Sequence, residues 1–478
     1  MRTIGLNPTV LGVSILLAWS SVAGAQQAGG GTWVTTWMAP VRLSISAPVG
    51  FGGGPRQSRP GAAAAQISRP TPGQVNPAPS VNLSASPSSQ DAAASPGTPT
   101  NSALANAPRQ VLSLERLENQ TVRMIVRVSL GGHHFRLRFT NAFGAEPLTI
   151  DAVRAGLQDR DAVVKADTDR QVLFNGKAKT VIGPGMEILS DPFDIEVPAF
   201  THLAISVFVA SYQSSPTTHP ASLHTISYVS REKGDLTAQA SLTEVDASNA
   251  YYWLSGIDVL GSRSAGTIVA IGDSITDANG AQARDEDWPS RLAERLQTNK
   301  NTSKFAVADA GISGNRLLAD GASVSGLARL ERQALSQPGV RWVILLEGIN
   351  DIGFSSLTNS GLTSADVIGA YRQVIAKAHS FGVRVAGCTL LPDKGAFYYR
   401  AEKANLRQQV NDWIRTSGAF DAVIDFDEAM RDKNDPEQIR LDLQRGDHLH
   451  PNSAGYKVMS DAIDLRLFTA KPAPTTQH

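Results

Sequence analysis

The sequence predicts an α/β fold, in which a parallel five-stranded sheet carries helices on both faces, with an all-β region before it. Two observations support this prediction. From residue 266 to about residue 470, short apolar runs alternate with segments of helical periodicity, which is the pattern of a doubly wound sheet. Between residues 110 and 253, apolar and polar residues alternate over short segments, as they do in half-buried strands.

The α/β domain, predicted at residues 266–470, has five apolar runs that we expect to be strands. They are residues 267–271 (TIVAI), 305–310 (FAVADA), 342–347 (WVILLE), 383–391 (VRVAGCTLL) and 422–426 (AVIDF). The helices expected around them are residues 288–297, 325–335, 364–382, 401–418 and 452–468. Gly382 and Gly418 stand where a helix C-terminus favours glycine. This order predicts a flavodoxin-like sheet, whose ligands bind beyond the carboxyl ends of the strands.

The N-terminal β domain, predicted at residues 26–255, shows the alternation most clearly at residues 121–130 (TVRMIVRVSL) and 133–143 (HHFRLRFTNAF). Residues 201–210 (THLAISVFVA) predict a further strand. Gly131-Gly132 lies between the first two segments and predicts a hairpin turn there. Several short strands without helical periodicity favour a sandwich or a jelly-roll-like domain.

Residues 46–108 are rich in Pro, Ala, Ser and Gly, and such a composition buries too little apolar surface to offset the entropy of ordering. We therefore expect them to be a disordered insertion in the β domain. Residues 1–25 combine Arg2, an apolar run and the small residues that end at Ala25, which predicts a cleaved signal peptide and export to the periplasm or beyond. The alternative is a short membrane anchor, but the apolar run is shorter than the roughly 20 residues of a spanning helix. Residues 471–478 are expected to be a flexible tail.

The composition excludes several classes of protein. The 478 residues contain 44 basic and 44 acidic side chains, so no basic surface for nucleic acid or for a membrane is indicated. No second long apolar run follows the signal, and stable membrane insertion is not expected. The single cysteine, Cys388, excludes an intrachain disulfide and a thiolate metal cluster. It lies in an apolar run and is expected to be a buried core thiol.

Four polar segments follow predicted strands or precede the last predicted helix. They are residues 272–274 (GDS), 311–315 (GISGN), 348–351 (GIND) and 447–451 (DHLHP). Together they supply a hydroxyl, a glycine turn, a side-chain amide, and a carboxylate three residues before a histidine. These groups are the ones that acyl transfer requires.

A serine hydroxyl attacks a carbonyl only when a base removes its proton, and histidine titrates in the right range. His450 is the candidate base for Ser274, and Asp447 can fix its tautomer because a spacing of three lets one turn hold both side chains. An oxyanion needs preorganised donors. The N–H groups of Ser274 and Gly314 and the side-chain amide of Asn350 are the candidates.

Simpler interpretations exist for each segment. Asp273-Ser274 can cap a helix, and Asn350-Asp351 can form a turn, with Asp351 in a structural role. Asp447, His448 and His450 can be metal ligands, but three ligands within four residues rarely fit one tetrahedral site. The sequence assigns no role to the histidines of the β domain, which are His133, His134 and His219.

The segments GDSITD, GISGN, GIND and DHLHP resemble the four signature blocks of the SGNH/GDSL hydrolase superfamily, in the family's order. Residues 121–150 and 450–465 are also similar to the secreted two-domain bacterial members, which are lysophospholipase-like esterases. The resemblance covers nearly the whole mature chain except the insertion. Residue 276 is Thr, so the segment lacks the Gly-x-Ser-x-Gly motif of the α/β-hydrolase fold.

Carried over by position, the resemblance implies Ser274 as nucleophile, His450 as base and Asp447 as its orienting acid, with Gly314 and Asn350 as oxyanion donors. It implies no metal and no organic cofactor. The expected function is an exported serine esterase that acts on short-chain acyl esters, acetyl above all, of carbohydrates. Lysolipids and aryl esters are alternative substrates, and an inactive glycan-binding surface protein is the alternative from another class. The sequence assigns no oligomeric state.

Overall fold

The computed structural model describes residues 30–42, 117–212, 217–220, 226–358 and 360–469. The described residues all belong to one compact unit of the chain. The expected insertion, the expected signal peptide and the expected tail lie outside the described residues.

A parallel sheet with the strand order β18-β17-β19-β20-β21 forms the centre of the α/β domain. Its strands are β17 Gly266–Gly272, β18 Phe305–Gly311, β19 Val340–Leu346, β20 Arg384–Cys388 and β21 Ala422–Ile424. Every residue of β17 is buried, because a strand inside a parallel sheet is covered on both faces. The prediction of an α/β domain is confirmed, and Cys388 is a buried core thiol as expected.

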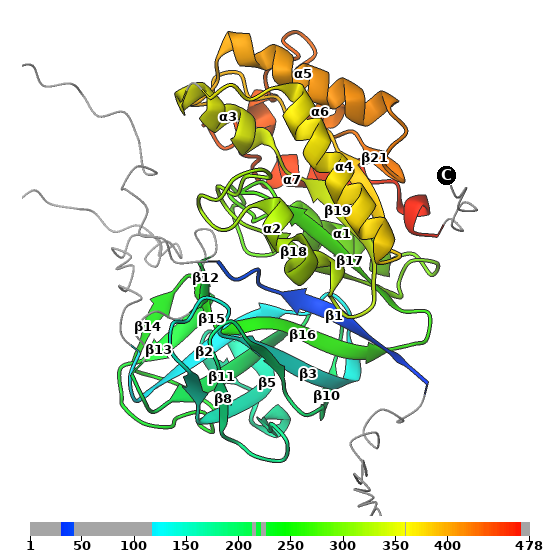
Figure 1. Ribbon diagram of the computed structural model, residues 1–478. Coiled ribbons are helices and arrows are strands. Elements are labelled where there is room, and N and C mark those ends of the chain that lie inside the picture. The colour runs from blue at the N-terminus through cyan, green and yellow to red at the C-terminus, as the bar shows by residue number, and fades with distance from the viewer. Residues whose placement is uncertain (1–29, 43–116, 213–216, 221–225, 359, 470–478) are drawn as a thin grey trace, which may run out of the picture. The chain divides into compact units, whose positions relative to one another are not determined.

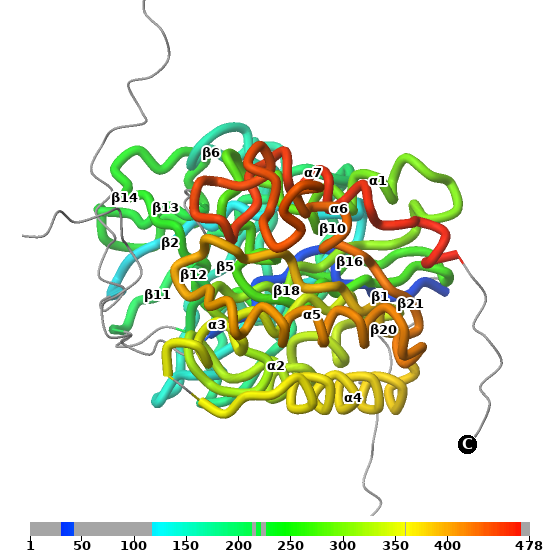
Figure 2. Tube along the Cα trace, turned by 90° about the horizontal axis from the view of Figure 1, so that it is seen from above, coloured from blue at the N-terminus to red at the C-terminus, as the bar shows by residue number. Residues whose placement is uncertain are grey.

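The helices of this domain are α1 Trp288–Gln297, α2 Gly326–Leu330, α3 Ile349–Thr358, α4 Ser364–Ser380, α5 Ala401–Thr416, α6 Phe426–Met430 and α7 Ser453–Asp461. The crossover from β17 to β18 runs opposite in direction to those that lead on to β19, β20 and β21. Right-handed crossovers of opposite direction place their helices on opposite faces of a sheet. Accordingly α1 packs on α7, while α4 lies beside α5 (Figure 2). Among the described residues, no helix combines the length and the hydrophobicity that a membrane span requires.

Two expected elements differ in detail. The helix expected at residues 325–335 forms as α2 followed by a π-helical turn, Glu331–Leu335. The segment around Asn350 and Asp351, whose residue types favour a turn, forms the first turn of α3. The side chains of Asn350 and Asp351 make their hydrogen bonds to the loop of residues 315–318, so they fasten α3 to that loop and do not close a turn of their own.

The N-terminal β region contains two antiparallel sheets that share one hydrophobic core. The first has β1 Thr32–Met38, β16 Leu254–Gly261, β3 Gly132–Thr140, β10 Phe193–Val197 and β9 Glu187–Leu189. The second has β14 Val245–Ser248, β13 Ser227–Ser230, β2 Gln120–Arg127, β11 His202–Val209, β5 Ala152–Arg160, β6 Val163–Val164 and β7 Arg170–Val172. Two short pairs complete the region, β12 Thr218–Pro220 with β15 Ala250–Tyr252, and β4 Leu148–Ile150 with β8 Thr180–Ile182.

The hairpin expected at Gly131-Gly132 is wrong. The strands on either side of it, β2 and β3, belong to different sheets, so the chain crosses from one sheet to the other at this point. Glycine is needed because a Cβ on Gly131 would collide with the backbone of residues 197–199. Gly131 therefore marks a close backbone approach and not a tight turn.

Hydrogen bonds join the β region to the α/β domain, with β1 beside both (Figure 1). The N–H of Thr35 in β1 donates to Thr267 Oγ1 at 2.9 Å. Ser129 Oγ, which follows β2, donates to the carbonyl oxygen of Val307 at 2.8 Å. Both contacts are buried, and they explain why the two regions form one compact unit.

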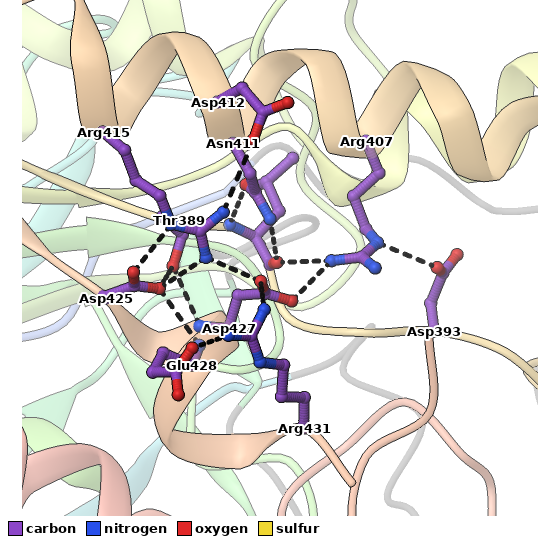
Figure 3. A network of polar contacts seen from close by, with 11 residues as sticks. Thr389, Asp393, Arg407, Asn411, Asp412, Arg415, Asp425, Asp427, Glu428 and Arg431 are labelled. Carbon is purple, nitrogen blue, oxygen red and sulfur yellow. Dashed lines mark hydrogen bonds and ion pairs between the residues drawn. The ribbon is translucent and has the colours of Figure 1, made fainter. Parts of the chain in front are cut away.

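A network of charged side chains fastens α5 to the loop after β20 and to the beginning of α6 (Figure 3). Arg407, which is fully buried, donates to the carbonyl oxygen of Leu390 at 3.1 Å and to Asp427 Oδ1 at 2.8 Å. Its Nε lies 3.5 Å from Asp393 Oδ1. Burial raises the pKa of Asp393 to about 6, against the opposing charge of Arg407. The network therefore holds the beginning of the loop after β20 against the body of the domain.

Candidate active site

Ser274 lies two residues beyond the end of β17, where the chain turns back on itself. The backbone N–H groups of Thr276 and Asp277 donate to the carbonyl oxygen of Asp273 at 3.1 and 2.9 Å. The turn needs glycine at position 272, because a Cβ there would collide with the side chain of Thr276. Ser274 is 6% exposed, so the hydroxyl is held at the carboxyl edge of the sheet in a nearly buried place.

Three of the predicted residues form one chain of hydrogen bonds. His450 Nε2 lies 2.8 Å from Ser274 Oγ, and His450 Nδ1 lies 2.7 Å from Asp447 Oδ2. The other oxygen of Asp447 accepts the backbone N–H groups of Leu449 and His450 at 3.1 and 2.9 Å. The spacing of three therefore lets one short turn before α7 orient both the carboxylate and the imidazole.

The charge of Asp447 determines the tautomer of His450. Partial burial alone would raise the pKa of Asp447, but hydrogen bonds from His450 and Arg445 outweigh it and hold that pKa well below its usual range. Asp447 is thus a carboxylate and an acceptor for the Nδ1–H of His450. The neutral ring then has its lone pair on Nε2, where it accepts the hydroxyl proton of Ser274.

The predicted oxyanion donors lie on the neighbouring strand ends. The N–H of Ile312 donates to the carbonyl oxygen of Gly272 at 3.0 Å, which joins the loop of Gly314 to that of Ser274. Gly314 has a φ of +77°, a conformation that favours glycine. Within the described part of the chain, the N–H groups of Ser274 and Gly314 have no hydrogen-bond acceptor. Two backbone donors without an acceptor are therefore present on loops that a hydrogen bond joins.

Asn350 joins the same group from the first turn of α3. Its Nδ2 donates one hydrogen to the carbonyl oxygen of Asn315 at 2.9 Å, and the side chain is 4% exposed. An amide nitrogen has two hydrogens, so the second is free to act as a donor. Asp351 has the structural role expected of it, because its two oxygens accept the N–H groups of Leu317 and Leu318 at 2.7 and 2.9 Å.

Arg329 on α2 lies under all these loops, and the sequence gives no sign of it. It donates to the carbonyl oxygens of Gly272 and Ala310, to Asn315 Oδ1 and to Glu347 Oε1, at distances of 2.5 to 2.9 Å. Arg329 is 2% exposed and Glu347 is fully buried. The guanidinium of Arg329 thus joins the carboxyl ends of β17, β18 and β19.

Replacing Arg329 by methionine should lower the free energy of unfolding by about 3–5 kcal/mol, the usual cost of leaving one charge of a buried pair alone. Burial already raises the pKa of Glu347 well above its usual value, and Arg329 opposes that rise. Urea unfolding measures the loss, and a second change, Glu347→Gln, should restore part of it. Arg332→Met is the matched control because Arg332 is exposed on the next turn. A loss below about 1 kcal/mol for Arg329→Met would contradict this role.

Asp273, the residue before Ser274, has a buried carboxyl group. Its Oδ1 accepts the N–H of Ile275 at 2.9 Å, and its Oδ2 has no hydrogen-bond partner among the described residues. Burial raises the pKa of Asp273 to about 7 from an unfolded value of 3.8. An acid with a raised pKa stabilises the fold at low pH and loses that contribution as the pH rises through its folded pKa.

The variant Asp273→Asn should therefore gain stability relative to the wild type as the pH rises from 4 to 7, by at most about 1.4 kcal/mol for each pH unit. Urea unfolding at several pH values measures the difference. Asp366→Asn is the control, since hydrogen bonds from Thr363 lower the pKa of Asp366 and its contribution to stability does not fall as the pH rises. If the difference in unfolding free energy between Asp273→Asn and the wild type did not change with pH, Asp273 would not be a buried acid with a raised pKa.

His448 lies apart from the hydrogen bonds that join Ser274, His450 and Asp447. Its Nδ1 lies 3.1 Å from Gln438 Nε2, and its ring packs against Gly395. Asp447 and His450 contact each other, as described above. No group of three or more His, Cys, Asp or Glu side chains in the described ranges is arranged to hold a metal ion.

A serine, a histidine and a carboxylate in one hydrogen-bonded chain, beside unused backbone donors, define the general class of serine hydrolases. Residues 270–458 match the GDSL-like lipase/acylhydrolase family, and the α/β domain belongs to that family. The chain is therefore a carboxylic ester hydrolase. No curated protein matches the sequence.

Among solved structures, an acetyl xylan esterase is 24% identical, with 41% of this chain and 96% of that chain covered and a TM-score of 0.33. A variant of an acetyl-xylooligosaccharide esterase from Geobacillus Stearmophilus is 19% identical, with 44% of this chain and 96% of that chain covered and a TM-score of 0.34. A GDSL-like lipase from Bacteroides thetaiotaomicron VPI-5482 is 17% identical, with 42% and 87% covered and a TM-score of 0.32.

Proposed function

We propose that the chain is an exported serine esterase in which Ser274, His450 and Asp447 form the catalytic triad and short acyl esters of carbohydrates are the substrates. The single observation that carries this proposal is the continuous path from Ser274 Oγ to His450 at 2.8 Å and on to Asp447 at 2.7 Å. A carboxylate, an imidazole and a hydroxyl in this order have the geometry of nucleophile activation.

In the first half of the reaction, His450 Nε2 takes the hydroxyl proton while Ser274 Oγ attacks the ester carbonyl. The N–H groups of Ser274 and Gly314 and the second amide hydrogen of Asn350 stabilise the negative oxygen that forms. Asp447 stabilises the imidazolium. The protonated His450 then donates its proton to the departing alcohol oxygen, and an acyl-enzyme remains on Ser274.

In the second half, water occupies the place that the alcohol has left. His450 removes one proton from the water, the resulting oxygen attacks the acyl carbonyl, and the same donors hold the second oxyanion. The proton returns from His450 to Ser274 Oγ as the acid departs. Each of the donors in this scheme typically contributes a factor of about 10²–10³ to the rate.

The small exposure of the reacting groups supports a short acyl group. Ser274 is 6% exposed and His450 is 9% exposed, so little open surface adjoins the hydroxyl. A long acyl chain requires an extended apolar pocket beside the nucleophile. We therefore expect acetyl esters to be preferred.

An aromatic surface on the active-site loops supports a carbohydrate alcohol. Phe397 in the loop after β20 is 57% exposed, and its ring lies 6.5 Å from that of Phe354 on α3. The guanidinium of Arg316, two residues after Gly314, lies 6.0 Å from the Phe354 ring. Aromatic faces suit the apolar face of a sugar ring, and export with an added β region suits an extracellular polysaccharide ester.

The test is a substrate panel on the chain without residues 1–25. It includes acetylated sugars, a lysophospholipid, and p-nitrophenyl esters from acetate to dodecanoate. We expect the highest kcat/KM on acetyl esters and a steady decline with acyl length. Preference for the lysophospholipid or for the dodecanoate would replace the carbohydrate assignment. A chain that hydrolyses none of these esters and does not react with a fluorophosphonate at Ser274 would overturn the esterase proposal.

A further inference from the structure

A histidine of the β region reaches into the loops of the active site. His219 in β12 is 4% exposed, and its Nε2 lies 3.0 Å from Asp277 Oδ1, three residues after Ser274. Its Nδ1 lies 2.8 Å from the carbonyl oxygen of Pro40, just after β1. The Tyr251 ring stacks on the imidazole with 6.4 Å between centroids. Three segments of the β region therefore fix one imidazole against the α/β domain.

Asp277 passes this contact on to the oxyanion loop. Its second oxygen, Oδ2, accepts the backbone N–H of Ser313 at 2.8 Å and the Ser313 hydroxyl at 2.6 Å. Ser313 directly precedes Gly314, the proposed backbone donor. Two hydrogen-bonded steps therefore connect His219 to the residue that sets the direction of the Gly314 N–H.

The hydrogen-bond partners fix the orientation of the imidazole. A carbonyl oxygen only accepts, so His219 carries a hydrogen on Nδ1 for Pro40. Asp277 Oδ2 accepts both donors of Ser313, and Oδ1 shares a hydrogen bond with His219 Nε2. His219 and Asp277 are 4% and 6% exposed. The pair resists displacement because either partner alone would be left with an unsatisfied buried polar group.

We propose that His219 is a positioning residue: through Asp277 and Ser313 it fixes the Gly314 N–H for the oxyanion, so the β region completes the active site of the α/β domain. This inference rests on the proposed function. The alternative is that His219 only fastens the β region to the α/β domain. A positioning role predicts a lower kcat in a folded variant of His219, whereas a purely structural role predicts an unchanged kcat.

The test uses His219→Ala in the full mature chain. Without His219 the Gly314 N–H should no longer be held in line with the oxyanion, and kcat on p-nitrophenyl acetate should fall by about 10- to 100-fold. This loss is smaller than that expected when a donor is removed completely. KM should change less than about threefold, because the donor acts on the transition state and not on the bound ester. Added imidazole should restore kcat, since the cavity of about 150 Å³ that His219 and Asp277 line adjoins the vacated place.

The matched control is His134→Gln, because His134 is an exposed histidine of the same region, paired with Asp194 at 2.6 Å. It should leave kcat and KM unchanged. A folded His219→Ala variant with the kcat of the wild type, or a kcat that imidazole does not raise, would overturn the inference. Should His219→Ala fail to fold, Ser313→Ala takes its place, since it removes one hydrogen bond of Asp277. An unchanged kcat in that variant would equally overturn the inference.

Failure of this inference and failure of the proposed function are distinguishable. If the wild type hydrolyses no ester and does not react with a fluorophosphonate, the esterase proposal itself is wrong. If the wild type is active and the variants of His219 and Ser313 are equally active, the triad stands and only the role of the β region is refuted.

Discussion

The variant Ser274→Ala is expected to lose ester hydrolysis almost completely, with kcat lower by about 10⁶-fold. Alanine has no Oγ, so neither attack on the carbonyl nor the acyl-enzyme is possible, while His450 and Asp447 keep their places. The residual rate should reflect only the oxyanion donors and substrate binding. The measurement is kcat on p-nitrophenyl acetate, with fluorophosphonate labelling and mass spectrometry to locate the modified residue.

Two controls make this result specific. Ser264→Ala changes an exposed serine just before β17 and should retain full activity. Circular dichroism and urea unfolding should show Ser274→Ala folded, with a change in stability below about 1 kcal/mol, because a hydroxyl-to-methyl change removes one hydrogen bond. If Ser274→Ala retained most of the activity, the triad assignment would have to be withdrawn.

The sequence predicted the parts of the fold that depend on local patterns. The strand expected at residues 267–271 lies within β17 Gly266–Gly272, and the helix expected at residues 288–297 is α1. Apolar runs and helical periodicity reflect which side chains face the core, and this pattern can be recognised in one sequence. The places of Ser274 and Gly314 follow in turn, because in a parallel sheet the strand ends meet at one edge.

The sequence could not predict contacts that join distant segments. Arg329 looks like any basic residue of an amphipathic helix, and only the fold brings it to Gly272 and Glu347. His219 likewise has no local pattern that connects it to Asp277. The error at Gly131-Gly132 has the same origin, because the choice between a hairpin and a crossing of sheets depends on which strands pair far along the chain.

Two of these distant contacts share one physical feature, which is a hydrogen-bonded pair of ionisable side chains removed from water near the active-site loops. The pairs Arg329–Glu347 and His219–Asp277 are both buried, at distances of 2.9 and 3.0 Å. Buried pairs add little net stability, but they resist displacement. They therefore suit a site in which backbone donors must keep their direction while charge develops on the substrate.

The second large effect is expected for Asp447→Asn, which should lower kcat by about 10⁴-fold although it changes only one atom of the side chain. The Oδ1 position accepts the N–H groups of Leu449 and His450, so the amide oxygen must remain there. The amide nitrogen then faces His450 Nδ1. The ring is forced to accept at Nδ1 and to carry its hydrogen on Nε2, where it can no longer take the proton of Ser274.

Comparison of kcat in the two proteins measures this effect, and Asp442→Asn is the matched control, since Asp442 is an exposed carboxylate of the same segment that pairs with Arg440. Stability supplies an independent readout. The pKa of Asp447 is lowered in the fold, so its contribution is present above the unfolded pKa of about 3.9 and lost as the pH falls through the folded value. The stability of wild type and Asp447→Asn should therefore differ most near neutral pH and converge in strong acid. An Asp447→Asn variant as active as the wild type would show that something other than this carboxylate sets the tautomer of His450.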